Sequence, residues 1–197
     1  MTLLDTSGPV AVIANALDAA PAEMRILGVR DELAALGHLG LAAEEVDLRK
    51  YFADRQHLAD TLASYQLVWL RGGNVFVLRS ALARSGADHI LVELLGRDAL
   101  VWAGYSAGCC VLAPSLRGLD LMVDPAAVQA CYGAEPTWEG LGLLAYAIVP
   151  HYRSQHPQAE AAERLVARYR AEGVAYRALR DGQAIVIDAR GSAPLTD

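Results

Sequence analysis

A serine stands between two glycines in the stretch Gly104-Tyr105-Ser106-Ala107-Gly108. The strand-forming run 99–103 precedes this motif, and an apolar, helix-compatible segment follows it. In that context G-x-S-x-G is the pattern of a nucleophile elbow, a tight turn that exposes the serine hydroxyl. The Ala107 amide would lie at a helix N-terminus, where it can stabilise an oxyanion. The motif therefore predicts a nucleophilic Ser106, with a plain strand–helix turn as the alternative.

A serine hydroxyl needs a general base, which is usually a histidine held by a carboxylate. Of the five histidines, His151 follows the apolar run 143–149 and a proline directly. His156 begins the next helical pattern and could line the same pocket. The other three lie in helix or loop contexts: His38, His57 and His89. We therefore expect His151 to be the base, with His156 as the second candidate.

Three carboxylates lie in segments from which they could orient that histidine: Asp181, Asp188 and Glu160. Asp181 stands in the tight turn Leu179-Arg180-Asp181-Gly182 between two predicted strands, so it is the most rigidly placed. We expect Asp181 to be the acid, and the other two remain open.

A second strand end carries two glycines. The buried run 67–70 leads to Gly72-Gly73-Asn74 and then to the helical pattern 75–83. Such glycines permit a close approach of the backbone to a ligand and can direct amides at it. Taken alone, the stretch is better explained as a simple turn. Asn74, Tyr105 and His156 are candidate substrate-binding residues, for each of which a purely structural role is equally open.

Strands and helices alternate along the chain. The expected strands are 9–14, 45–48 (an edge strand), 67–70, 99–103, 143–149, 173–176 and 183–187, and the expected helices 21–36, 54–63, 75–83, 85–95 and 158–170. Mostly continuous apolar strands in this order predict an α/β fold, with a mostly parallel sheet and helices on both faces. Ligands bind such sheets at the carboxyl ends of the strands, where the glycine turn, Ser106 and His151 all fall.

The composition fits one globular domain spanning residues 1–197, with a loose tail from about residue 191. A net charge of −6 gives no basic footprint for nucleic acid, and no apolar run is long enough for a membrane span. Cys109, Cys110 and Cys131 make a poor disulfide framework, which favours a reducing cytoplasm and a buried structural role for the adjacent pair. No cluster has metal-ligand spacing, so we expect no metal.

Five motifs in this order resemble the serine peptidase family of aspartyl dipeptidase (peptidase E) and cyanophycinase: Gly72-Gly73-Asn74, Gly104-Tyr105-Ser106-Ala107-Gly108, Gly140-Leu141-Gly142, Pro150-His151 and Leu179-Arg180-Asp181-Gly182. The resemblance runs from about residue 10 to 187. It implies a three-layer fold related to class I glutamine amidotransferases and no metal or organic cofactor. It also implies a triad of Ser106, His151 and Asp181. The implied oxyanion donors are the amides of Ala107 and of Gly73 or Gly72.

We therefore expect a cytoplasmic serine exopeptidase that hydrolyses dipeptides or short peptides. Chain order argues against α/β-hydrolase esterases, which place the acid before the histidine. A preference for N-terminal aspartate would need a cation, for which Arg153 and Arg164 are the nearby candidates. An esterase or amidase with the same triad, and a catalytically silent peptide-binding module, remain alternatives. The surface of helix 158–170 could mediate a homodimer, but a solvated face explains it as well.

Overall fold

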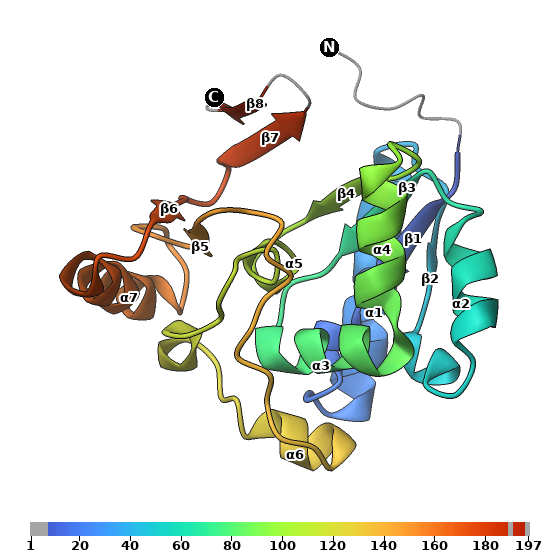
Figure 1. Cartoon of the computed structure of the whole chain (residues 1–197), viewed down its shortest axis with the longest axis horizontal. Coiled ribbons are helices and arrows are strands. Elements are labelled where there is room, and N and C mark those ends of the chain that lie inside the picture. The colour runs from blue at the N-terminus through green and yellow to red at the C-terminus, as the bar shows by residue number, and fades with distance from the viewer. Residues whose placement is uncertain (1–7, 189–190, 196–197) are drawn as a thin grey trace.

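The structure is a computed structural model that describes residues 8–188 and the backbone of 191–195 (Figure 1). Its helices are α1 (Ala22–His38), α2 (Arg55–Leu62), α3 (Val75–Ser85), α4 (Ala87–Gly96), α5 (Ala107–Cys110), α6 (Ala127–Tyr132) and α7 (Ala159–Glu172). Its strands are β1 (Val10–Ile13), β2 (Ala43–Glu45), β3 (Leu67–Leu70), β4 (Val101–Gly104), β5 (Ala147–Val149), β6 (Tyr176–Ala178), β7 (Ala184–Asp188) and β8 (Gly191–Leu195). Three 3-10 turns are η1 (Asn15–Leu17), η2 (Leu48–Tyr51) and η3 (Leu119–Leu121).

The main sheet has four parallel strands in the order β2-β1-β3-β4. Successive residues of a strand point to opposite faces of the sheet, so β1 contributes side chains to two hydrophobic clusters. Val10 and Val12 pack with Val29 and Leu36 of α1 on one face. Alternate residues pack with α2, α3 and α4 on the other face (Figure 1). The predicted α/β fold, with a mostly parallel sheet between helical layers, is confirmed.

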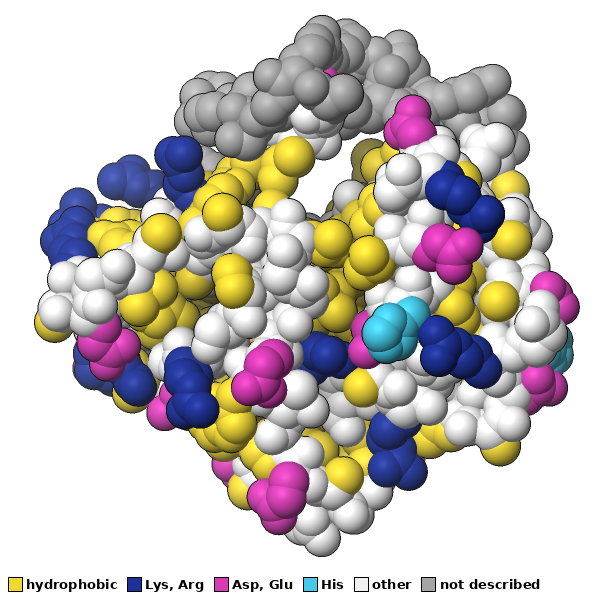
Figure 2. Space-filling view, viewed as in Figure 1, with side chains coloured by type: hydrophobic (Ala, Val, Ile, Leu, Met, Phe, Trp, Pro, Cys, Tyr) yellow, Lys and Arg dark blue, Asp and Glu magenta, His cyan; other side chains and the backbone are white. Residues whose placement is uncertain are grey.

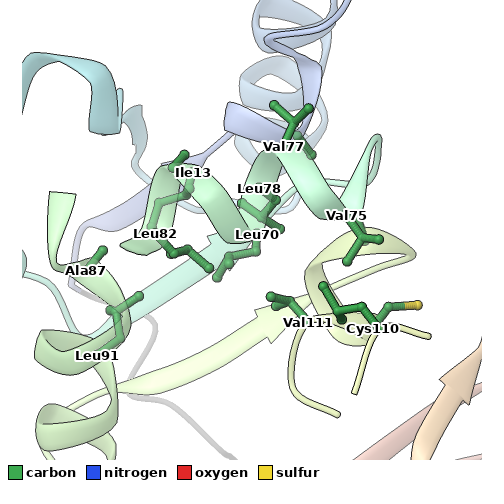
Figure 3. Packing of buried hydrophobic residues seen from close by; sticks show 14 of the residues in the cluster. Ile13, Leu70, Val75, Val77, Leu78, Leu82, Ala87, Leu91, Cys110 and Val111 are labelled. Carbon is green, nitrogen blue, oxygen red and sulfur yellow. The ribbon is translucent and has the colours of Figure 1, made fainter. Parts of the chain in front are cut away.

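The larger core joins the strands to the helix that follows the G-x-S-x-G motif. Figure 3 shows Leu70 of β3 among Leu78 and Leu82 of α3, with Cys110 and Val111 close by. Of the cysteine pair predicted to be buried, Cys110 is buried and Cys109 is half-buried. A hydrogen bond with the Cys109 thiol and burial raise the pKa of Cys110, which keeps it a neutral thiol. The turn at Ser106 is therefore anchored on the core of the protein.

The later strands do not extend the main sheet. β5 and β6 form a parallel pair, and β7 pairs with β8 in antiparallel orientation. The strand expected at 143–149 is reduced to Ala147–Val149, because the Leu144 amide donates to Leu112 O in the segment after α5. Residues 191–195, expected to be a loose tail, form β8.

Three predicted boundaries are wrong, two of them for a local reason. The strand expected at 45–48 ends at Glu45, because the Asp47 side chain accepts from Arg49 N and caps η2. The first helix passes through Gly37 to His38. The strand expected at 173–176 begins at Tyr176, because Gly173 ends α7 in a left-handed conformation.

The outward face of α7 is charged. Arg164 pairs with Glu160 and Arg168 with Glu172 along the exposed side of the helix. Figure 2 shows arginine side chains along this edge of the molecule. A face of this kind suits contact with water, and the homodimer stays a prediction. Within the described residues, no helix combines the length and apolar composition that a membrane crossing needs.

Candidate active site

Ser106 occupies a strained turn between β4 and α5. Its backbone angles are φ 50° and ψ −115°, a region that non-glycine residues rarely adopt. The two glycines of the motif allow the elbow to lie against the end of β3. A Cβ at Gly104 would lie 2.6 Å from the carbonyl oxygen of Leu70, and one at Gly108 would overlap the same oxygen. The motif thus reflects the close approach of the elbow to the neighbouring strand.

The β5–β6 pair positions His151 and Asp181. The strands run parallel, with Val149 opposite Ala178, so their carboxyl ends meet at one edge. Tyr152 N donates to Leu179 O at 2.9 Å, which joins the two loops just beyond the strands. Asp181 N donates to the Ser154 hydroxyl at 2.8 Å. Ser154 was missed by the sequence analysis, because its role depends on a loop contact across 27 positions.

The side chains of Ser106, His151 and Asp181 lie in a row, each within hydrogen-bonding distance of the next. His151 Nε2 lies 3.2 Å from Ser106 Oγ, and His151 Nδ1 lies 2.7 Å from Asp181 Oδ1. The His151 side chain is 12% exposed and that of Asp181 is 50% exposed. A neutral imidazole with its proton on Nδ1 can donate to Asp181 and accept the serine proton at Nε2. The arrangement is chemically suited to activating a serine nucleophile.

The alternative acids lie in other settings. Glu160 forms an exposed ion pair with Arg164 at 2.6 Å, and Asp188 ends β7. The structure brings Asp181 to His151.

The Gly72-Gly73 turn lies directly beside the elbow. A Cβ at Gly72 would lie 2.8 Å from the Tyr105 ring and 3.0 Å from Ser106 Cβ. Gly73 has φ +149°, and a Cβ there would lie 2.5 Å from Ala16 O, so only glycine fits. Among the described residues, none accepts a hydrogen bond from the N–H of Gly73 or of Ala107. Both amides therefore have no partner in the described part of the chain, and their role as oxyanion donors stays a prediction.

His156 lies against the candidate base. Its ring stacks on His151 at 3.6 Å between centroids with an interplanar angle of 7°. The Gln158 amide donates to His156 Nδ1 at 3.1 Å. Burial and then the neighbouring His151 lower the pKa of His156, against a smaller opposing effect of Asp181. His156 is therefore held as a neutral ring behind His151.

The other two candidate binding residues have partners within the protein. The Asn74 side chain caps α3 by accepting from Phe76 N and Val77 N, and it donates to Asp124 O. The Tyr105 hydroxyl donates to Glu32 Oε2 at 2.8 Å. Tyr105 directly precedes Ser106, and Asn74 directly follows Gly73, a candidate oxyanion donor. The contact of either side chain with substrate stays a prediction.

No metal site accompanies this arrangement: the described part of the chain has no group of three or more His, Cys, Asp or Glu side chains that could hold an ion.

The fold and this arrangement define an α/β protein with a serine elbow at a strand end. The chain belongs to peptidase family S51, whose sequence model matches residues 27–193.

Several curated relatives carry peptidase names. "Uncharacterized peptidase Lin0382" of Listeria innocua is 30% identical over 135 residues, which is 68% of this chain and 61% of that protein. "Peptidase E" of Streptomyces coelicolor is 37% identical over 119 residues, 59% of this chain and 44% of that protein. The chain thus spans less than two thirds of either relative.

Solved structures share the fold. A candidate peptidase E protein from Listeria monocytogenes EGD-e superposes with a TM-score of 0.80 at 22% identity, covering 98% of this chain and 88% of that one. A peptidase from an acI-B1 actinobacterium gives 0.66 at 14% identity, covering 95% and 74%.

Proposed function

We propose that the protein is a serine peptidase that hydrolyses dipeptides or short peptides. The observation that carries the proposal is the row from Ser106 Oγ through His151 to Asp181, with distances of 3.2 and 2.7 Å. Membership of peptidase family S51 supports a peptide substrate.

In the first half of the reaction, Ser106 Oγ attacks the scissile carbonyl carbon while His151 Nε2 takes the hydroxyl proton. The carbonyl oxygen becomes an oxyanion that the amides of Gly73 and Ala107 bind. The tetrahedral intermediate collapses as the C–N bond breaks, and His151 gives its proton to the leaving amine. An acyl-Ser106 ester and a free amine result.

Water completes the cycle. His151 takes a proton from a water molecule whose oxygen attacks the ester carbonyl carbon. The second tetrahedral intermediate collapses as the bond from that carbon to Ser106 Oγ breaks, and His151 returns the proton to Oγ, which releases the acid product and restores the hydroxyl. Throughout, the Asp181 carboxylate accepts from His151 Nδ1–H and stabilises the imidazolium that forms.

The test is a mass-spectrometric screen of a free dipeptide library with the wild-type protein and Ser106→Ala. We expect cleavage by the wild type and a loss of at least about 10³-fold in the variant. Labelling by a fluorophosphonate that persists in Ser106→Ala would contradict the proposal, because the reactive hydroxyl would then lie elsewhere.

The same screen reports substrate preference. Recognition of an N-terminal aspartate would need a positively charged side chain near Ser106, His151 and Asp181. Arg164 is paired with Glu160, whereas the Arg153 guanidinium lies over the Tyr152 ring at 5.0 Å, two residues from His151. If Asp-Xaa peptides are preferred, we expect Arg153→Met to reduce the preference about tenfold and Arg164→Met to leave it unchanged.

A further inference from the structure

Glu32 of α1 contacts hydrogen-bond donors next to both turns of the candidate active site, the Gly72-Gly73 turn and the turn at Ser106. Its carboxylate, 11% exposed, accepts from Trp69 Nε1 at 2.7 Å and from the Tyr105 hydroxyl at 2.8 Å. Arg71 Nε lies 3.1 Å from Glu32 Oε2. Burial and the hydrogen bond to Glu32 raise the pKa of Tyr105 to about 12, so the phenol remains protonated and donates. One carboxylate thus joins β3, the residue before the glycine turn and the residue before Ser106.

α1 forms a slot for the Arg71 guanidinium. Gly28 precedes Glu32 by four positions, so both lie on the same face of the helix. A Cβ at Gly28 would lie 3.3 Å from Arg71 Nη2 and 2.8 Å from Leu17 Cδ1. Glycine inside a helix costs about 1 kcal/mol relative to alanine. At Gly28 this cost has a physical reason, because a side chain there would crowd the guanidinium.

From this slot Arg71 reaches the backbone of the glycine turn. Its Nη1 donates to Gly72 O at 3.1 Å. In a trans peptide the C=O and the following N–H point in opposite directions, so this bond turns the Gly73 N–H away from Arg71. Among the described residues, none accepts a hydrogen bond from the Gly73 N–H, so this amide is available to a ligand.

We propose that Arg71, seated between Gly28 and Glu32 of α1, is a positioning residue that fixes the Gly72–Gly73 peptide with its N–H toward the oxyanion. The inference rests on the proposed function. Arg71 touches no reacting atom in this scheme and acts through the peptide that it holds.

The test combines steady-state kinetics with amide hydrogen exchange. For Arg71→Met we expect kcat to fall about 10–100-fold with KM within about twofold, since an oxyanion donor acts mainly in the transition state. We also expect faster exchange at the Asn74 amide, which donates to Ala16 O at 2.9 Å and protects the end of the turn. Glu32→Gln keeps an acceptor but removes the charge, and should give a smaller change in the same direction.

Gly28→Ala on the same helix should reproduce the loss of kcat by crowding the guanidinium. Two further variants of α1 are matched controls. Gly37→Ala, where a Cβ would meet no atom within 4 Å, should leave kcat and exchange unchanged. Asp31→Asn, which removes an exposed ion pair with Arg30, should also have no effect.

The kinetic and exchange results for Arg71→Met either support or overturn the role of Arg71. Unchanged kcat, a change in KM alone, or an Asn74 amide that exchanges as in the wild type would overturn it. A wild-type protein without Ser106-dependent turnover would refute the proposed function instead, and exchange at Asn74 in Arg71→Met would still show whether Arg71 holds the turn.

Discussion

Asp181 approaches His151 from the protein surface, with half of its side chain exposed. The Asp181→Asn variant keeps the shape but favours the wrong tautomer of His151. Because water can partly replace an exposed carboxylate, we expect kcat/KM to fall about 10²–10³-fold, less than at a fully buried acid.

The measurement is kcat/KM on the best dipeptide of the screen. Glu160→Gln and Asp188→Asn, which alter the two alternative acids, should stay within about twofold of the wild type. An Asp181→Asn enzyme with wild-type activity would assign the acid to another group.

His156 predicts a pH dependence of stability at the same site. Its pKa is lower in the folded protein than the ordinary 6.5, so the unfolded chain binds more protons as the pH falls below about 6.5. Its contribution to stability is therefore present above that pH and is lost progressively below it. His156→Phe keeps an aromatic ring on His151 without titrating.

We expect the wild-type Tm to fall more than the Tm of His156→Phe between pH 7.5 and pH 5, as measured by calorimetry in matched buffers. Equal decreases in the two proteins would show that His156 carries no such linkage.

The contact between the elbow and β3 is the feature that matters most at the scale of elements. A Cβ at Gly108 would overlap Leu70 O, which belongs to the backbone and cannot rotate away. We expect Gly108→Ala to separate α5 from β3, lowering the free energy of unfolding by about 3 kcal/mol and removing most activity. Urea unfolding followed by circular dichroism measures the loss.

Gly96→Ala at the end of α4 is the matched control, because a Cβ there meets no atom within 4 Å. It should leave stability unchanged or raise it by up to about 1 kcal/mol. A Gly108→Ala protein as stable as this control would contradict the packing argument.

The sequence predicted those elements whose signals are local. The alternation of apolar strands and helices was sufficient for the α/β fold, and the glycine turn and G-x-S-x-G each followed a buried strand, as observed. The predicted Ser106, His151 and Asp181 lie together in the structure. The parallel strands β5 and β6 bring His151 and Asp181 to a shared edge, whereas Ser106 reaches them from the separate sheet that contains β4.

What the sequence could not show depends on contacts between distant segments. The separation of β5 and β6 from the main sheet follows from hydrogen bonds such as Leu144 N to Leu112 O, which no strand pattern encodes. Nothing in the sequence indicates the pairing of Glu32 with Arg71, because the two residues meet only when α1 packs on the sheet. His156 was expected to line a pocket, and its stacking on His151 required the loop conformation.

At the scale of the whole molecule, a partly buried charge network ties α1 and η2 to the ends of β1 and β2. Arg25 pairs with Asp18 and Glu45, both at 2.6 Å, and Arg49 pairs with Asp47 at 2.7 Å. Burial favours a higher pKa for Asp47, but hydrogen bonds from Arg49 and Asn15 outweigh it and lower the pKa to about 2.

Because the folded pKa of Asp47 lies below its ordinary value of 3.8, the stability it contributes is present above about pH 4 and is lost as the pH falls toward 2. The difference corresponds to about 2 kcal/mol. We expect Asp47→Asn to be less stable at pH 7 and to lose less further stability between pH 4 and pH 2, as measured by urea unfolding. Parallel pH profiles for the two proteins would refute this assignment.

The proposed nucleophile and its two proposed partners follow strands of different sheets. Ser106 follows β4 of the four-stranded sheet, whereas His151 and Asp181 follow the β5–β6 pair, and Cys110 Sγ donates to Ile148 O at 3.4 Å across the boundary. Turnover would therefore require two separately hydrogen-bonded parts to stay in contact within a fraction of an ångström. In such an enzyme, activity reports whether the two parts are correctly assembled. A change anywhere along the boundary between them can abolish activity while each part keeps its own structure.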